Sequence, residues 1–299
     1  MPLEKLDDNS TKPVGVLAAW GRLPIVVAQS LRAEGRRVVC LGVRGHARRE
    51  DYDALADAFY WIGPSRLGKA IRLFRRHGVL QATMAGKFHK VRLYDPGMWL
   101  RYAPDPTGAR AFYRSFVTRS ADRRDDTLLG RIVEVFAEGG VTMRPATDFA
   151  PELLVREGHV AGPAPSAAQR TDIEFGWRLA REMGRLDVGQ SVCVKGQAVL
   201  AVEAIEGTDL CIGRAGQLCR GGGFTVVKVA KPQQDMRFDV PTVGLRTLRT
   251  MREAGGRVLA IEADRTILLD QDAFRREAAR MGVTVVALRS AADCLPLAA

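Results

Sequence analysis

Short apolar runs alternate with amphipathic stretches in the first part of the chain. The run at 13–19 predicts a buried strand. A helix should follow from Leu23 and Pro24, because proline suits the first helical turn, and Gly35 should end it. Residues 37–43 predict a second strand. This order predicts a β-α-β unit with parallel strands, the start of an α/β domain.

The same pattern continues to residue 90. Ser65 is expected to cap a helix at 66–77, and Gly78 to end it. Residues 79–85 predict the next strand, so Gly86 follows its carboxyl end. That edge is where parallel α/β sheets bind ligands.

The second half also alternates between strand and helix patterns. It predicts, in order, a helix at 169–183, a hairpin around Lys195–Gly196, strands at 198–204 and 224–229, a helix after Gly244, strands at 257–262 and 266–269, a helix from Asp272 and a strand at 283–288. The stretch 158–168 is rich in small residues and proline, which is typical of a linker. We expect two α/β domains: a Rossmann-like parallel sheet at 13–160 and a C-terminal catalytic domain with a mixed sheet at 165–290.

The composition fits a large folded protein. The chain has 299 residues, 46% of them hydrophobic, which is enough to bury the cores of two domains. No apolar run approaches the roughly 18 residues of a membrane span, and residues 1–12 are polar, so we expect a cytoplasmic protein. The cysteines are Cys40, Cys193, Cys211, Cys219 and Cys294, with no C-x-x-C pair. That spacing fits a reducing compartment and argues against a cysteine-built zinc site.

The net charge narrows the class of partner. A formal charge of +11 and a pI near 9.8 indicate an anionic partner. A nucleic acid, an anionic membrane surface and a phosphorylated small molecule all fit that charge. The arginine-rich pieces at 72–76 and 119–124 are short, and no nucleic-acid-binding motif accompanies them. We therefore expect no nucleic-acid partner.

The turn after the first strand carries a weak ligand signal. A-A-W-G-R-L-P contains one glycine, Gly21, where a dinucleotide fingerprint has three, and no acidic residue ends the second strand. We therefore expect no NAD-type site. A structural turn and a nucleotide-contacting turn both remain open. In the segment Gly86–Lys90, the lysines could meet phosphate, and His89 could be a general base or a plain polar contact.

Two acidic motifs have more than one interpretation. Asp125 and Asp126 open an expected helix, where the helix dipole favours acids, yet adjacent carboxylates also suit a magnesium site. In the motif E-G-T-D, Thr208 offers a hydroxyl, and Asp209 could cap a helix or bind a cation. The sequence does not separate these interpretations.

The stretch 227–244, V-K-V-A-K-P-Q-Q-D-M-R-F-D-V-P-T-V-G, carries the densest candidate chemistry. Its basic residues are Lys228, Lys231 and Arg237, and its acidic residues are Asp235 and Asp239. Prolines bracket the acidic pair, which argues against a helix and favours a fixed loop. Its cations could hold an oxyanion, and a carboxylate could hold a metal or take a proton from water. A surface turn with ordinary ion pairs is the alternative.

Several of these stretches together resemble the UDP-2,3-diacylglucosamine pyrophosphatase family of the LpxI type. The shared motifs are G-R-L-P at 21–24, A-G at 85–86, D-D at 125–126, R-L-D-V-G-Q at 185–190, L-A-V-E-A-I-E-G-T-D at 200–209 and K-P-Q-Q-D-M-R-F-D-V-P-T-V-G at 231–244. They occur in order between about residues 14 and 288, and the last three are specific.

The resemblance implies a magnesium-dependent hydrolase of lipid A biosynthesis. Such an enzyme cleaves the pyrophosphate of UDP-2,3-diacylglucosamine to UMP and the 1-phosphate sugar lipid called lipid X, with two α/β domains enclosing the product. The essential aspartate of the family corresponds to Asp239. The resemblance places its other ligand contacts at Gly21, Leu23, Gln190, Thr208, Asp209 and Lys231.

Physical chemistry supports the same reaction class. Water that attacks a diphosphate approaches two negative charges, which Lys228, Lys231 and Arg237 could neutralise. Asp239, alone or with Asp209 or the Asp125–Asp126 pair, could hold Mg²⁺ or orient water, and we favour the metal role. The basic charge would also support transient contact with an anionic inner membrane surface, where a diacylated substrate lies. Monomeric and oligomeric states both remain open.

The chain departs from the family at two places. Ala19 and Trp20 replace two glycines of the usual first-turn triplet, and Arg124 replaces the usual glycine before the paired aspartates. The altered turn motivates a second hypothesis, a non-catalytic regulator that binds a nucleotide sugar or lipid. The intact E-G-T-D and R-F-D-V-P motifs favour the enzyme.

Overall fold

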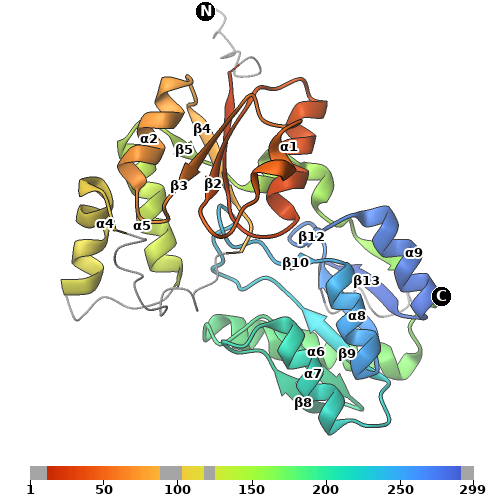
Figure 1. The fold of residues 1–299 in the computed structure, drawn as a ribbon. Coiled ribbons are helices and arrows are strands. Elements are labelled where there is room, and N and C mark those ends of the chain that lie inside the picture. Colours follow the sequence, from red (N-terminus) through yellow and green to blue (C-terminus); the bar gives the residue numbers. More distant parts are fainter. Residues whose placement is uncertain (1–11, 88–102, 118–124, 291–299) are drawn as a thin grey trace, which may run out of the picture. The chain divides into compact units, whose positions relative to one another are not determined.

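The computed structural model describes residues 12–87, 103–117 and 125–290, which form two α/β units (Figure 1). Unit 1 comprises Met1–Ala150 and the short segment Asp235–Phe238. Unit 2 comprises Pro151–Gln234 and Asp239–Ala299. Each unit is therefore built from two separate pieces of the sequence.

Unit 1 is built on a parallel sheet of five strands in the order β3-β2-β1-β4-β5. The strands are β1 (Val14–Ala18), β2 (Val38–Val43), β3 (Ala58–Ile62), β4 (Gln81–Ala85) and β5 (Thr142–Met143). The helices are α1 (Leu23–Ala33), α2 (Leu67–Arg76), α4 (Pro106–Val117) and α5 (Asp125–Glu138), with 3-10 turns η1 (Arg49–Tyr52) and η3 (Ala146–Asp148). The expected Rossmann-like sheet is confirmed. Its strand order reverses between β1 and β4.

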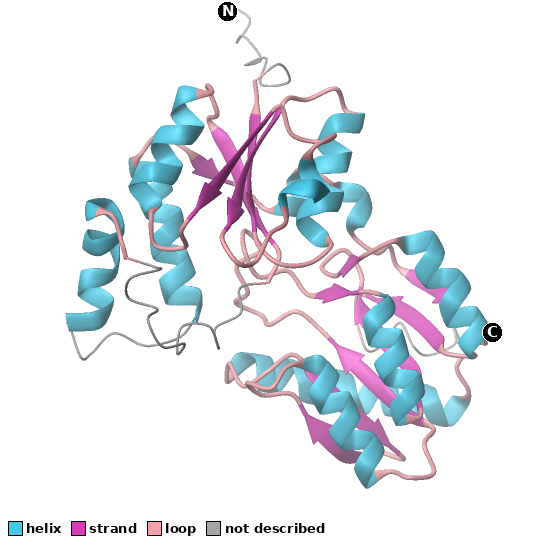
Figure 2. Cartoon of the chain, in the orientation of Figure 1, coloured by secondary structure: helices cyan, strands magenta, loops and turns pink. Residues whose placement is uncertain are grey.

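Helices cover both faces of the unit 1 sheet (Figures 1 and 2). α1 lies on one face, and α2 and α5 lie on the other, where Phe74 and Phe136 pack with ring centroids 6.2 Å apart. Gly15 makes this packing tight, because a Cβ there would lie 2.6 Å from the Phe74 ring. The glycine lets α2 approach the centre of the sheet.

The expected cap of α2 by Ser65 is wrong. α2 begins at Leu67, and Arg66 at its N-cap makes no side-chain capping bond. Instead, the carboxylate of Asp105, which is distant in sequence, caps the helix. It accepts hydrogen bonds from the Lys69 N–H (2.8 Å) and from the Gly108 N–H (2.8 Å). One side chain thus satisfies donors in the first turns of both α2 and α4.

Unit 2 contains a six-stranded mixed sheet in the order β6-β13-β11-β9-β7-β8. The strands are β6 (Gly158–Ala161), β7 (Ser191–Lys195), β8 (Ala198–Val202), β9 (Phe224–Lys228), β11 (Gly256–Glu262) and β13 (Thr284–Leu288), and β10 (Thr242–Val243) pairs separately with β12 (Ile267–Leu268). The helices are α6 (Ala167–Arg185), α7 (Thr208–Leu218), α8 (Leu245–Ala254) and α9 (Gln271–Met281), with a 3-10 turn η4 (Pro151–Leu153). The central β13, β11 and β9 are parallel, and the outer pairings are antiparallel. The expected mixed sheet is confirmed.

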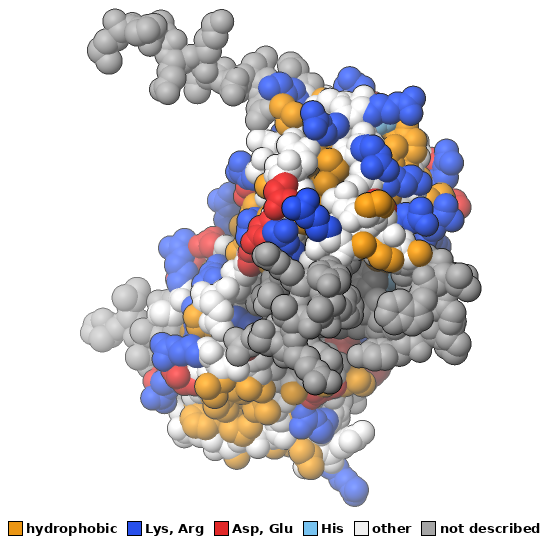
Figure 3. Space-filling model, turned by 90° about the vertical axis from the view of Figure 1, so that its left-hand side faces the viewer, with side chains coloured by type: hydrophobic (Ala, Val, Ile, Leu, Met, Phe, Trp, Pro, Cys, Tyr) orange, Lys and Arg blue, Asp and Glu red, His pale blue; other side chains and the backbone are white. Residues whose placement is uncertain are grey.

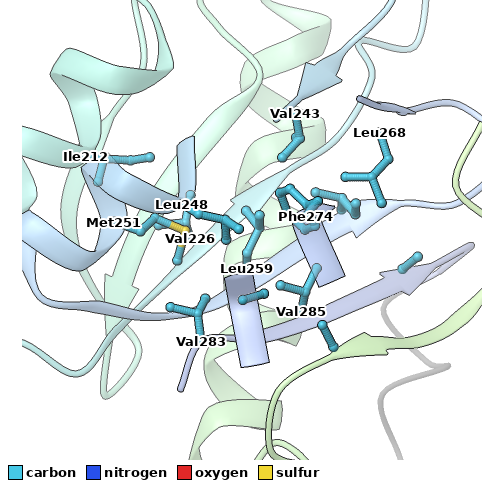
Figure 4. Packing of buried hydrophobic residues seen from close by; sticks show 14 of the residues in the cluster. Ile212, Val226, Val243, Leu248, Met251, Leu259, Leu268, Phe274, Val283 and Val285 are labelled. Atoms are coloured by element: carbon cyan, nitrogen blue, oxygen red, sulfur yellow. The ribbon is translucent and has the colours of Figure 1, made fainter. Parts of the chain in front are cut away.

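Alternation along the strands of unit 2 builds two apolar layers. On β9, Val226 packs into the layer under α7, α8 and α9, whereas Val227 packs into the layer under α6. Figure 4 shows the first layer. Its labelled side chains are Ile212, Val226, Val243, Leu248, Met251, Leu259, Leu268, Phe274, Val283 and Val285. Strands buried on both faces read as continuous apolar runs, which is why the sequence located them well.

The stretch 158–168, expected as a linker, lies inside unit 2. Residues 158–161 form β6, which pairs antiparallel with β13. Ser166 and Gln169 then form a capping box that starts α6. The passage between the units falls at Ala150–Pro151 instead of near residue 165. Proline and glycine here mark the ends of an edge strand, not a flexible connection.

Lys and Arg side chains are spread over the face of unit 1 in the upper part of Figure 3. This matches the basic net charge of +11. Within the described ranges, no helix combines the length and the apolar character needed to cross a bilayer.

Leu248→Ala should lower the free energy of unfolding by about 2–5 kcal/mol, because it leaves a cavity at a side chain with no solvent exposure. Leu218→Ala is the matched control, since Leu218 is 65% exposed on α7, and its effect should stay within about 0.5 kcal/mol. Urea unfolding followed by circular dichroism measures both. Equal effects would contradict the assigned layer.

Candidate functional site

A buried chain of polar side chains lies at the carboxyl end of β9. The ammonium Nζ of Lys228 donates to Thr208 Oγ1 (2.9 Å) and to the Thr242 carbonyl (3.3 Å). Thr208 Oγ1 in turn lies 3.1 and 3.2 Å from the two carboxylate oxygens of Glu203. Lys228 is 6% exposed and Glu203 is 7% exposed. A hydroxyl therefore joins a buried cation to a buried anion.

The direction of these bonds is fixed by the number of hydrogens. A hydroxyl has one hydrogen, and an ammonium can only donate. Thr208 must therefore accept from Lys228 and give its hydrogen to Glu203. Ser191 Oγ lies 3.4 Å from the same hydroxyl. In this arrangement the Thr208 side chain has no hydrogen left for another acceptor.

The start of α7 presents the E-G-T-D motif. Gly207 is the N-cap with φ of +85°, and it makes no side-chain cap, so the first N–H groups of α7 follow a glycine turn. Asp209 lies in the first turn, and its carboxylate pairs with Arg246 at 2.8 Å. Asp209 is therefore neutralised by a neighbouring guanidinium instead of acting as the N-cap.

The loop between β9 and β10 brings Lys231 and Asp239 together through one glutamine. Gln234 Oε1 accepts from the Lys231 backbone N–H (2.8 Å), while its Nε2 donates to Asp239 Oδ2 (2.7 Å). Gln234 is 7% exposed. Within the described residues, the other Asp239 oxygen has no hydrogen-bond partner. The expected fixed loop is confirmed as a non-helical segment.

The end of α6 anchors this loop. Lys231 Nζ pairs with Asp187 at 2.6 Å, and a Cβ on Gly184 would lie 3.1 Å from Pro232. At Ala230, the residue before Lys231, the backbone N–H donates to the Glu262 carboxylate (2.7 Å), which also pairs with Arg181 on α6 (2.7 Å). The positions of Lys231 and Gln234 are thus set by packing against a helix.

Arg237 is occupied by its own neighbour. Its Nε lies 2.9 Å from Asp235 Oδ1, and its backbone N–H donates to the same oxygen at 3.0 Å. These bonds hold the pKa of Asp235 below its usual range and raise the pKa of Arg237, to which the charge of Glu134 adds. The segment belongs to unit 1, where Phe238 packs on the core cluster of α2 and α5.

In unit 1, backbone hydrogen bonds join the turns that follow β1 and β4, at the carboxyl end of the parallel sheet. Trp20, after β1, pairs with Lys87, after β4: the two N–H groups donate to the opposite carbonyls at 3.1 and 2.8 Å. Gly86 has φ of +94°, and a Cβ there would lie 2.8 Å from the Trp20 oxygen. Gly21 lies in the same turn with φ of +112°, and Leu23 is the first residue of α1.

Gln190 precedes β7 and offers a buried acceptor. Its backbone carbonyl accepts from the Val229 N–H at 3.0 Å. Its side-chain Oε1 is buried with no hydrogen-bond partner among the described residues. A buried acceptor without a partner costs about 1–3 kcal/mol, so a ligand donor would be favoured there.

Some expected residues fall outside what can be described. Asp125 and Asp126 begin α5 as expected, but their side chains lie outside the described residues. His89 and Lys90 lie in the range 88–102, which is also outside them. Among the described residues, no three His, Cys, Asp or Glu side chains gather into a metal-binding group.

Sequence reasoning missed Glu203, Gln234 and Asp187. Glu203 had one available signal, an acid directly after an apolar strand that leads to E-G-T-D. Gln234 gave no charge signal. Asp187 pairs with Lys231 across 44 residues, a separation that no local pattern reveals.

Two family models match this chain. The model described as the LpxI N-terminal domain matches residues 13–153, and the model described as the LpxI C-terminal domain matches residues 156–286. A curated relative from Caulobacter vibrioides, named UDP-2,3-diacylglucosamine pyrophosphatase LpxI, is 29% identical over 284 residues, which is 92% of this chain and 97% of the relative.

Similar solved structures are more distant. The Bordetella bronchiseptica enzyme WbmG in complex with NAD is 11% identical, and the match covers 46% of this chain and 37% of WbmG with a TM-score of 0.29. The Thermus thermophilus UDP-glucose 4-epimerase complex with NAD is 16% identical, covering 52% and 41% with a TM-score of 0.29. Similarity at this level supports no assignment.

The Asp235–Arg237 pair should stabilise the protein only at higher pH. Because the pKa of Asp235 is lowered by folding, its contribution is present above the unfolded value of about 4 and is lost as pH falls through the folded pKa. Asp235→Asn should cost about 0.5 kcal/mol at neutral pH, since the pair is partly exposed, and less in acid. Urea unfolding across pH measures this. Arg237→Met should give the same loss and the same trend, and a pH-independent loss would contradict the pairing.

Gly86→Ala should destabilise the protein more than Gly21→Ala, by about 1–3 kcal/mol. Both glycines have positive φ, so both alanines strain the backbone, but a Cβ at Gly21 has open space and one at Gly86 meets the Trp20 carbonyl. The difference isolates the close approach of the two turns. Thermal unfolding of the two variants measures it, and equal midpoints would argue against the Trp20–Lys87 bridge.

Proposed function

The chain belongs to the LpxI family, and on that basis we propose that it hydrolyses the pyrophosphate bond of UDP-2,3-diacylglucosamine in lipid A biosynthesis, releasing UMP and 2,3-diacylglucosamine 1-phosphate (lipid X). The observation that carries the proposal is the match of both family domains along the chain, with a relative of that name aligned over 92% of it. The geometry of unit 2 supports a phosphate-directed site.

The reaction needs charge neutralisation and a positioned water. The water oxygen bonds to one phosphorus, the bond from that phosphorus to the bridging oxygen breaks, and the protons of water leave to a base or to solvent. Each product is a phosphomonoester. Little covalent chemistry falls to the protein, so positioning and electrostatic stabilisation supply most of the rate.

Lys228 and Lys231 are the cations that we assign to the diphosphate. Both lie at or just beyond the carboxyl end of β9, where parallel strands of α/β sheets direct their ligands. Lys228 is 6% exposed, and a charge held in such a water-poor place acts more strongly than one in solvent. Lys231 and Arg237 each already pair with a carboxylate, Asp187 and Asp235, so Lys228 is the principal cation in this proposal and the other two contribute less.

Asp239 is the carboxylate that we assign to the reacting centre. Gln234 holds one of its oxygens, which orients the other. This fits the usual mode of Mg²⁺, which takes one or two carboxylates together with substrate phosphates instead of a cage of protein ligands. Bound there, Mg²⁺ would neutralise charge that develops on the phosphate oxygens. Asp209 is a weaker candidate, since Arg246 neutralises it at 2.8 Å, and Asp125 and Asp126 stay as proposals.

The remaining contacts in the proposal are neutral. The first backbone N–H groups of α7, at Thr208 and Asp209, suit a phosphate oxygen. The buried Oε1 of Gln190 suits a hydroxyl or N–H of the sugar or the nucleotide. Gly21, Leu23 and Gly86 stay as proposed nucleotide contacts. The basic face of unit 1 would support transient attraction to an anionic membrane surface at the cytoplasmic side.

UMP release from UDP-2,3-diacylglucosamine in detergent micelles tests the proposal. The purified protein should release UMP with Mg²⁺, lose the activity when the metal is chelated, and regain it when Mg²⁺ is restored. Asp239→Ala should lower kcat by about a thousandfold or more, because the carboxylate acts at the reacting phosphate. Asp272→Asn is the matched control, because Asp272 is an exposed acid on α9, and it should keep full activity.

A folded wild-type protein that releases no UMP would sink the hydrolase. Saturable binding of the substrate in that case would favour the non-catalytic regulator that the Ala19–Trp20 turn motivates.

A further inference from the structure

Both the backbone and the side chain of Glu203 are constrained. It directly follows β8, and its backbone N–H donates to the Ser191 carbonyl at 2.9 Å. A Cβ on Gly189 would lie 2.0 Å from the Glu203 carbonyl oxygen, so the segment before β7 and the segment after β8 approach too closely for any larger residue at position 189. With its side chain also buried, Glu203 has little freedom to reorient.

Burying the Glu203 carboxylate lowers the stability of the folded protein, so stability does not explain its position. Removing a carboxylate and an ammonium from water costs several kcal/mol per ion, and a pair separated by a hydroxyl recovers less of that than a direct contact. The described hydrogen bonds of the Glu203 carboxylate all go to Thr208. Such a carboxylate acts through Thr208, by deciding where the single hydroxyl hydrogen points.

The orientation of the Thr208 hydroxyl also fixes its contact with Lys228. Because the Thr208 hydrogen goes to Glu203, its oxygen lone pairs are turned toward the Lys228 ammonium. Lys228 also donates to the carbonyl of Thr242, the first residue of β10, which follows the loop that carries Asp239. Within that loop, the Gln234 side chain donates to the Asp239 carboxylate. One line of hydrogen bonds therefore runs from Glu203 to the segment that carries the proposed reacting carboxylate.

We propose that Glu203 is a positioning residue: through the Thr208 hydroxyl it holds the Lys228 ammonium in the place and orientation in which Lys228 neutralises the diphosphate. This inference rests on the proposed function. Glu203 does not touch the substrate. Thr208 acts as a relay between the two charges, and its contact with the substrate comes from the backbone N–H.

Kinetics of UMP release by wild type, Glu203→Gln, Thr208→Val and Thr208→Ser test the relay. Glu203→Gln and Thr208→Val should each lower kcat about 100-fold, the effect of misplacing a catalytic group by about 1 Å, with KM changed less than about threefold. Thr208→Ser keeps the hydroxyl and should retain kcat within about threefold of wild type. Glu206→Gln, which removes a neighbouring acid paired with Arg214, should also stay within about threefold.

Non-additivity separates the relay from two independent contributions. The double variant Glu203→Gln/Thr208→Val should be no slower than the slower single variant, since both changes break one line. Multiplying losses would overturn the proposal. So would a Glu203→Gln enzyme with kcat near that of wild type, or one whose lost rate is fully accounted for by the fraction unfolded in a thermal scan.

A second measurement does not depend on the reaction. Protein labelled with ¹⁵N-lysine should show a slowly exchanging ammonium signal that disappears in Lys228→Met and is thereby assigned to Lys228. The signal should be lost in Glu203→Gln and Thr208→Val and kept in Thr208→Ser. If wild type releases no UMP, the proposed function fails, while this signal still decides whether Glu203 positions Lys228. A signal unchanged in Glu203→Gln would overturn the positioning role.

Discussion

A positive charge buried at the end of a strand must be compensated, and much of unit 2 is arranged around that requirement. Lys228 ends β9 with almost no solvent exposure. The compensation reaches it from β8 through Thr208 at the start of α7, and from β10 through a carbonyl. Three elements distant in sequence are thereby held at one edge of the sheet. The loop that carries Asp239 is tied to the same edge.

In unit 1, the carboxyl end of the sheet is shaped by backbone pairing between two turns instead of by a buried charge. In a Rossmann-like sheet the turns after β1 and β4 separate and leave a crevice for a ligand. Here the two turns pair through Trp20 and Lys87, and Gly86 permits the approach. The departure from the glycine triplet at Ala19 and Trp20 is therefore part of a backbone pairing. Any nucleotide contact at this turn would use a surface different from that of a dinucleotide-binding glycine turn.

Local patterns predicted the regular elements, and distant partners decided the rest. Apolar runs located β1, β2, β4, β9, β11 and β13, and the flanking prolines correctly predicted a non-helical loop around Asp239. The cap of α2 came from Asp105 instead of Ser65, and the supposed linker became β6 because β13 offers it a pairing edge. Lys228 and Thr208 were singled out from charge and motif, but Glu203 and Gln234 act through geometry that a linear pattern does not encode.

Because unit 1 is built from two separate segments of the sequence, the two units are difficult to separate or recombine at the level of the gene. The main segment of unit 1 ends at Ala150. The unit also includes Asp235–Phe238, and the Phe238 side chain packs on the core of unit 1. A gene that stopped after residue 150 would encode a sheet lacking that side chain. A gene that began at residue 151 would carry an orphan apolar residue in its central loop. The two coding segments are therefore poor candidates for separate expression or recombination, because only a single reading frame keeps Phe238 packed on the core of unit 1.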